Sequence, residues 1–390
     1  MQYGLLILPW WGYVGVALLF THITIVSVTI FLHRSQAHNS VDLNRGVAHF
    51  FRFWLWLTTG MNTREWAAVH RKHHAMVETS DDPHSPVFFG LRTLLLQGAE
   101  LYRVSAQDQD LVRQYGYGTP NDWIEVNLYS RFRYSGIVVM FLLDVIFFGP
   151  VGITIGAVQM MWIPFFAAGV INGLGHNSGY RNFETDDNST NLVPFGILIG
   201  GEELHNNHHA FAMSAKFSVQ PWEVDIGWLY LSILQRISLA KIKRVAPQKL
   251  DFELSDSTVD FDTLKAVVSN RLHVMADYHR RVVKKVYKRE IKTSPRLVRD
   301  KMRGVGNLIF RNDKKLSEQE RDVLNEVFFL NKRLEVVYGF RQKLNAFYER
   351  RTQSRESLVA LLEEWCFQAE KAGIAELQLF AKILRGYRTV

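Results

Sequence analysis

An uncharged apolar segment near the start of the chain most strongly limits what this protein can fold into. Leu5 to Leu32 contains no Asp, Glu, Lys or Arg. As a helix, these 28 residues would be about 42 Å long, which exceeds the roughly 30 Å hydrocarbon core of a bilayer. A buried helix of a soluble protein is rarely so long and so uniformly apolar. The segment is therefore predicted to span a membrane.

Two later apolar segments extend this prediction. In Ser135 to Gly175, Asp144 is the only charged residue, and Gly149-Pro150 is a turn signal that divides the segment into a helical hairpin. Val47 to Met61 is aromatic but short, and Arg52 interrupts it, which favours an interfacial or re-entrant helix. The predicted fold is all-α, with about three membrane spans plus this short helix.

Flanking charges predict the orientation of the first span. Met1 to Tyr3 has no charged side chain, whereas Arg34, Arg45 and Arg52 follow the apolar segment. Because cytoplasmic flanks are enriched in Lys and Arg, the N-terminus is expected outside and His33 at the cytoplasmic end. The first residues have neither a basic n-region nor a small-residue cleavage site, so no cleavable signal peptide is expected.

A dense histidine cluster, His70-Arg71-Lys72-His73-His74, lies just past the predicted interfacial helix. On a helix its three imidazoles occupy positions i, i+3 and i+4 and share one face. Three neutral imidazoles on one face suit a transition metal such as iron, zinc or copper. Taken alone, the cluster is equally consistent with a basic, solvated helix end.

Three further clusters favour the metal interpretation. His33 and His38 form an H-x4-H pair, whose rings would point about 140° apart on a continuous α-helix, so the helix must end or bend between them. Asn172 and His176 lie at i and i+4 on the inner end of the last span. The third cluster, His205, His208 and His209, repeats the spacing of residues 70–74.

Nine of the fourteen histidines lie in these four clusters, all on one predicted side of the membrane. Nine imidazoles exceed the three or four ligands of a zinc site, so two metals are predicted. Zinc hydrolysis remains open, but a histidine-only set at the bilayer surface favours iron and oxygen chemistry. The single cysteine, Cys366, excludes an internal disulfide and a cysteine-based metal site.

Residues 15–245 resemble the integral-membrane fatty-acid desaturases, most closely the stearoyl-CoA Δ9 type and its bacterial relatives. Besides the histidine clusters, the resemblance rests on Glu65-Trp66, Asp82-Pro83-His84, Asn172-x3-His176, Gly179-Tyr180-Arg181-Asn182 and Gly201-Glu202-Glu203-x-His205.

The resemblance implies roles for individual residues. Asn172 would hold a metal through water, Asp82, Glu202 and Glu203 would accept the second ring N–H of ligands, and Asn62 and Trp66 would line the acyl tunnel or contact the head group. His84 belongs to a motif but is not a ligand in the family. The implied catalytic ligands of two irons are His33, His38, His70, His73, His74, His176, His205, His208 and His209.

The implied activity is O2-dependent formation of a cis double bond, at Δ9, in a saturated acyl chain carried on CoA or a membrane lipid. The chain carries no cytochrome b5-like His-Pro-Gly-Gly motif, so a separate electron donor is expected, such as a ferredoxin with its reductase. The expected location is a bacterial inner membrane, with the site and the C-terminus cytoplasmic. Alternatives are a lipid hydroxylase with the same metals and a non-catalytic lipid- or nucleic-acid-binding membrane protein with structural metal.

Residues 251–390 are predicted to form a separate helical accessory domain, after a desaturase domain at residues 1–250. Asp251 to Asp262 resembles an acidic linker, and a basic belt follows between Lys284 and Arg303. The belt is either a solvated face or a contact with anionic lipid. The last sixty or so residues resemble the C-terminal part of insertion-sequence transposases (Leu361-Leu362-x2-Trp365, Ala372-Gly373-Ile374). No acidic catalytic set is found there, so nucleic acid is not an expected partner.

Overall fold

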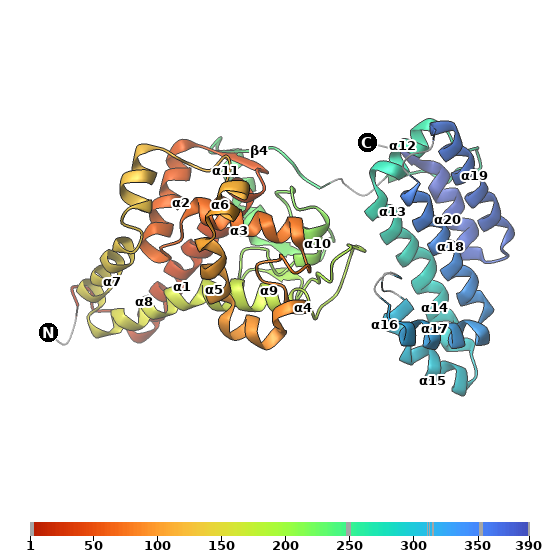
Figure 1. The fold of residues 1–390 in the computed structure, drawn as a ribbon, viewed down its shortest axis with the longest axis horizontal. Helices are drawn as coiled ribbons and strands as arrows, with labels where there is room; N and C mark the ends of the chain where they lie inside the picture. The colour runs from red at the N-terminus through yellow and green to blue at the C-terminus, as the bar shows by residue number, and fades with distance from the viewer. Residues whose placement is uncertain are drawn as a thin grey trace. The chain divides into compact units, whose positions relative to one another are not determined.

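The chain forms two compact units, Met1–Ala246 and Pro247–Val390, each of which is described by itself (Figure 1). The computed structural model describes residues 4–246, 251–309, 311, 313, 316–350 and 354–388. The apolar core of the first unit contains residues up to Ile242, and that of the second contains residues from Phe252 onward.

The apolar segment at the start of the chain forms one continuous helix. α1 (Trp10–Ser27) continues into the π-helix η1 (Val28–Ala37). A second long helix joins α8 (Pro150–Ile163), η3 (Pro164–Ile171) and α9 (Asn172–Leu174). In the described part of the chain, these two helices are long and apolar enough to cross a membrane.

The predicted hairpin is present, but its first arm is short. α7 (Ser135–Phe148) has 14 residues, or about 21 Å of helix, so the third expected span is not confirmed. Gly149 has a φ of +65°, which glycine adopts without steric cost. Pro150 is then the first residue of α8, where a backbone N–H would have no partner within the helix, so proline is favourable there.

The predicted interfacial segment forms α2 (Arg45–Thr58), which is capped by the side chain of Asn44 and has 14 residues. Its helix is followed directly by α3 (Thr63–Met76), which carries the dense histidine cluster. The other helices of the first unit are α4 (Pro86–Phe89), α5 (Leu91–Gln107), α6 (Gln109–Tyr115), η2 (Glu125–Ser130), α10 (His205–Ala210) and α11 (Ile226–Arg236).

Short strand pairs join segments that are distant in sequence. β1 (Val41–Leu43) pairs antiparallel with β4 (Ala240–Ile242), and β2 (Phe195–Gly196) pairs in parallel with β3 (Val224–Asp225). The first pairing connects the chain just after the end of η1 to the end of the unit.

One glycine allows α5 and η3 to pack backbone against backbone. A Cβ atom at Gly98 would lie 2.3 Å from the carbonyl oxygen of Ala168, a separation that no side chain tolerates. This close approach places the next turn of α5, with Ala99 and Tyr102, against the second long helix.

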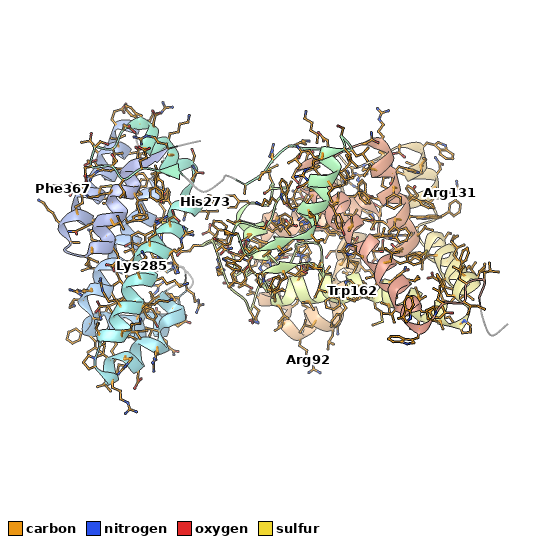
Figure 2. All side chains as sticks on the ribbon, turned by 180° about the vertical axis from the view of Figure 1, so that it is seen from behind. Arg92, Arg131, Trp162, His273, Lys285 and Phe367 are labelled. Carbon is orange, nitrogen blue, oxygen red and sulfur yellow. The ribbon has the colours of Figure 1, made fainter. Side chains whose placement is uncertain are left out.

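The C-terminal unit is a helical bundle around one apolar core, and Lys285 is exposed on its surface (Figure 2). β5 (Asp251–Phe252) pairs with β6 (Tyr387–Arg388). Its helices are α12 (Phe261–Ser269), α13 (Arg271–Tyr278), η4 (His279–Val283), α14 (Lys284–Thr293), α15 (Arg296–Gly304), α16 (Gly306–Ile309), α17 (Glu318–Leu330), α18 (Lys332–Glu349), α19 (Arg355–Lys371) and α20 (Ala375–Gly386).

The predicted acidic linker is wrong in its position, because this segment belongs to the C-terminal unit. Residues 251–252 are paired with the end of the chain, and Val259 is buried in the core. Asp260 accepts a hydrogen bond from the backbone N–H of Thr263 and caps α12. Asp251 therefore lies in a strand and Asp260 caps a helix, so both belong to the folded unit and not to a spacer.

A separate core in the C-terminal unit leads to a stability prediction. Residues 247–390 expressed alone should give a helical circular dichroism spectrum and unfold cooperatively. Leu344 is fully buried, so Leu344→Ala should lower the free energy of unfolding by about 2–5 kcal/mol. Leu297, which is 73% exposed, is the control, and Leu297→Ala should change it by less than about 0.5 kcal/mol. A fragment that melts without a cooperative transition would contradict an independent core.

Candidate metal centre

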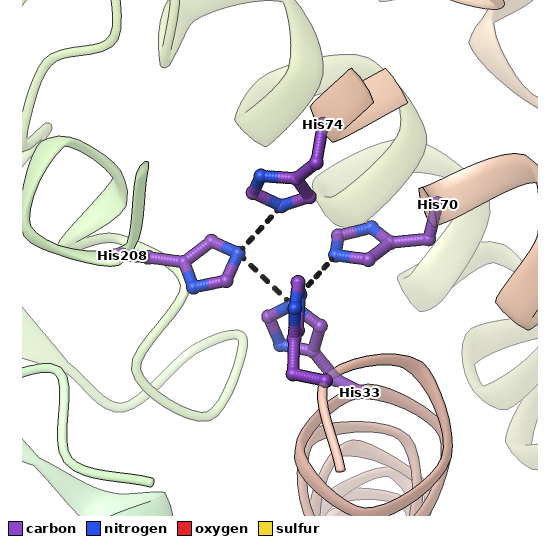
Figure 3. Close-up of side chains that lie close together, drawn as sticks. His33, His70, His74 and His208 are labelled. Atoms are coloured by element: carbon purple, nitrogen blue, oxygen red, sulfur yellow. Dashed lines mark hydrogen bonds between the residues drawn. The ribbon is translucent and has the colours of Figure 1, made fainter. Parts of the chain in front are cut away.

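Five histidine rings from three helices converge at one point in the first unit. His33 and His38 come from the end of η1, His70 and His74 from α3, and His208 from α10. The Nε2 atoms lie 3.1 Å apart for the pairs His33–His208 and His33–His38, 2.8 Å apart for His38–His70, and 2.9 Å apart for His74–His208. Figure 3 shows four of these rings pointing toward one another.

A second group contains the other four predicted ligands. One ring nitrogen of each of His73, His176, His205 and His209 lies within 4.8 Å of those of the others. The Nε2 atoms of His205 and His176 are 3.1 Å apart. The rings of His74 and His209 are neighbours, with centroids 4.5 Å apart, so the two groups lie side by side.

The π-helix η1 explains how an H-x4-H pair can serve one site. The backbone N–H of His38 donates to the carbonyl of His33, five residues earlier. In such a turn, residue i+5 lies nearly above residue i, whereas an α-helical turn would leave the two rings far apart. The helix also ends at Ala37, between the two histidines, as the sequence predicts.

The two groups fit metal ions. Two nitrogens bound to one ion at about 2.1 Å and at right angles are about 3.0 Å apart, which matches the separations between the Nε2 atoms. In the part of the chain that the structure describes, the Nε2 atoms of His73 and His209 are buried without a hydrogen-bond partner. Buried ring nitrogens facing a common centre need an ion to offset their desolvation.

Burial keeps the rings in the form that binds metal. Desolvation lowers the pKa of the rings of His38, His70 and His74 well below the usual value of 6.5. Burial also lowers the pKa of His209 to about 4, although the neighbouring Asp187 opposes the shift. Neutral imidazoles offer a lone pair, as metal ligation requires.

Carboxylates contact the outward nitrogens of four rings. Asp82 lies 2.9 Å from Nδ1 of His73, and Glu202 contacts Nδ1 of His33. Burial raises the pKa of the Asp82 carboxyl, but the hydrogen bond and charge of His73 outweigh it and hold that pKa well below its usual range. Such partners set the tautomer and the orientation of a ligand ring.

Two of these carboxylates were not predicted from the sequence. Asp187 lies 2.9 Å from Nδ1 of His209, and Glu78 lies 3.2 Å from Nδ1 of His176. Asp187 lies 22 residues from His209 in the sequence, and Glu78 lies 98 residues from His176. No short motif therefore links either carboxylate to its histidine. Only the position of Glu78 and Asp187 in polar loops next to recognisable motifs could have suggested them.

Glu203 is positioned differently from the expectation that it orients a ligand ring. Its carboxylate accepts hydrogen bonds from the backbone N–H groups of Leu198, Ile199 and Gly201. Glu203 therefore stabilises the turn before α10 instead of contacting a histidine. The sequence alone could not distinguish this role from that of the neighbouring Glu202.

The two predicted substrate residues lie in different environments. Asn62 caps α3 by accepting from the N–H groups of Arg64 and Glu65, and it donates to Ser130. Trp66 lies one turn further and stacks on His70, with ring centroids 5.0 Å apart. Trp66 lines a cavity, whereas Asn62 serves the start of the helix.

An apolar cavity of about 260 Å³ reaches the histidine groups. Asn172, at the end of the second long helix, and His84, whose ring stacks on His73, also face it. The other histidines outside the four clusters, at positions 22, 49, 273 and 279, belong to neither group. The cavity lining includes Val28, Trp66, Tyr102, Gln159, Met160, Ile163, Ala167, Ile171, His33, His70 and His205.

Long apolar helices, two groups of histidine rings and an adjoining apolar cavity define a membrane-type protein with a candidate metal centre beside a site for an apolar ligand. The family model for fatty acid desaturases matches residues 8–244. The chain belongs to this fatty acid desaturase family and is a fatty-acyl desaturase similar to those of the Δ9 type.

Curated relatives agree with this assignment. The chain is 30% identical over 243 residues to the sn-1 stearoyl-lipid 9-desaturase of Anabaena variabilis, which covers 61% of this chain and 86% of that protein. It is 30% identical over 237 residues to the Delta-9 acyl-lipid desaturase 2 of Arabidopsis thaliana, a match that covers 59% of this chain and 74% of that protein. The icosanoyl-CoA 5-desaturase of Limnanthes douglasii is 29% identical over 223 residues, covering 55% and 60%.

The C-terminal unit has a different relationship. Residues 263–390 match a transposase family model. Among the described residues, the two histidine groups lie entirely in the first unit, so the match concerns a part of the chain that contributes no ring to them.

The contact between Asp187 and His209 leads to a prediction about metal affinity. Asp187→Asn removes the negative charge behind His209 while keeping the shape of the side chain. It should weaken binding at the four-histidine group by about 10- to 100-fold, measured by iron loss to a chelator. Asp186→Asn changes an exposed neighbour and should leave the rate of loss unchanged. Equal rates for Asp187→Asn and the parent would contradict this role.

Proposed function

We propose that this protein introduces a cis double bond, at Δ9, into a saturated acyl chain carried on a membrane lipid or on coenzyme A, using two irons held by nine histidines. The observation that carries the proposal is the convergence of the nine imidazoles in two adjoining groups beside an apolar cavity. The names of the relatives in Anabaena and Arabidopsis support a lipid-linked Δ9 substrate.

The reaction removes two hydrogens from adjacent methylenes, and O2 is reduced to two waters with two further electrons and two protons. When bound, two irons would supply the redox chemistry that an unactivated methylene requires. The five-histidine group would hold one iron and the four-histidine group, with Asn172 facing the same cavity, would hold the other. The apolar walls, including Ile163 and Ala167, would bind the acyl chain and exclude water.

We further propose that the two long helices place the first unit in a bacterial inner membrane, with the site and the C-terminus cytoplasmic. A separate ferredoxin-type or flavoprotein donor would supply the electrons. In this proposal, residues 1–250 form the desaturase domain, and residues 251–390 form an accessory domain outside the metal centre. Lys284, Lys285 and Lys288, exposed on α14, give that domain its basic face.

The function is tested by lipid analysis in a host without desaturases. The parent should yield products lighter than the substrate by two hydrogens, with the double bond at Δ9. A product heavier by one oxygen would instead identify a hydroxylase. His208→Ala should abolish the product because it removes a ligand from the five-histidine group. His49→Gln, outside both groups, should retain it. Product from His208→Ala at the parent rate would contradict the proposed centre.

The cavity leads to a second prediction. Ala167→Phe fills part of the proposed acyl site, so it should lower the rate of product formation, because the added ring occupies volume that the acyl chain needs. The loss should be larger for long chains than for short ones, measured by competition between substrates. Val151→Phe, on an exposed position of the same helix, is the matched control. An equal effect of both substitutions would argue that the cavity does not hold the chain.

A further inference from the structure

We propose that Arg71 is a positioning residue for the five-histidine group, because its guanidinium holds the helix that carries His70 and His74 against the turn that carries His38. The inference rests on the proposed metal centre. It assigns a structural task to a residue that its sequence context alone associates with a solvated basic helix end.

The Arg71 bridge consists of the guanidinium and four backbone carbonyls. Nε donates to the carbonyl of Ala37 at 2.9 Å, and Nη2 donates to that of Gln36 at 2.6 Å. Nη1 donates to the carbonyls of Tyr115 and Tyr117, at 2.7 Å each. The guanidinium carbon also lies 4.3 Å from the centroid of the Tyr117 ring. One side chain thus joins three segments of the chain.

Two of the four acceptors explain why an arginine is needed. Gln36 and Ala37 lie at the end of η1, where carbonyls have no partner within the helix. A positive charge at a helix C-terminus is also favourable. The planar guanidinium donates in several fixed directions, whereas a lysine ammonium cannot reproduce this geometry. Arg71 is therefore a cap for the π-helix, supplied from another helix.

The position of the bridge makes its effect selective. The five-histidine group combines rings from η1 with rings from α3, and His38 and His70 approach to 2.8 Å between Nε2 atoms. Ala37 immediately precedes His38, and Arg71 immediately follows His70. The four-histidine group takes no ring from η1. Loss of the bridge should therefore loosen the first group and spare the second.

The experiment uses full-length protein loaded with ⁵⁷Fe and compares the parent with Arg71→Lys and Lys72→Gln. Iron content, Mössbauer spectra and the rate of iron loss to a chelator are measured. We expect two iron environments in the parent and in Lys72→Gln. Arg71→Lys should lose iron from one environment at least about tenfold faster than the parent does. In the double variant Arg71→Lys/His209→Ala, the iron of the other environment should be lost as well.

A milder variant separates the bridge from general folding. Tyr117→Leu removes the aromatic ring, which is exposed, but keeps the carbonyl acceptor, so iron loss from the same environment should accelerate to an intermediate extent. Circular dichroism of all variants should match the parent. Iron retention by Arg71→Lys at the parent rate would overturn the inference, and so would equal loss from both environments. A parent without iron would overturn the proposed metal centre itself.

Discussion

Burial of nine imidazoles around two points is the constraint on which the rest of the first unit depends. Each ring gives up hydration at both nitrogens, and a buried polar group without a partner is costly. The inward nitrogens face one another at about 3 Å, a separation suited to shared ions. Four of the outward nitrogens contact a carboxylate, and the fold around the site positions those carboxylates.

Buried amides hold one of those acceptors in position. Asn206 and Asn207, between the histidines of α10, are fully buried. Asn206 accepts from the backbone N–H groups of Asn182 and Phe183, and Asn207 accepts from the side chain of Asn182. These bonds hold the loop that carries Asp187 to His209. The two residues between the ligands of H-x2-H-H thus fix a loop rather than only spacing the rings.

The two units illustrate different ways of stabilising helices. In the C-terminal unit, a large apolar core containing Leu344 and Phe380 dominates, with caps such as Ser317 on α17 and a few buried polar groups such as Arg341. In the first unit, polar contacts between distant segments dominate near the site. The buried pair of Arg34 and Asp225, 2.9 Å apart next to His33, is one example. Breaking one partner of such a pair leaves an uncompensated buried charge.

The sequence by itself determined the apolar helices, the hairpin turn at Gly149-Pro150 and the nine rings that the structure brings together, because these depend on local composition and spacing. Tertiary structure alone decided that η1 is a π-helix, that Glu203 holds a turn, and that Asp187 and Glu78 support ligands. It also decided that Arg71 joins three segments. The physical reason is that an outward ring nitrogen or a helix-end carbonyl needs some partner, but which residue reaches it depends on contacts between segments far apart in the chain.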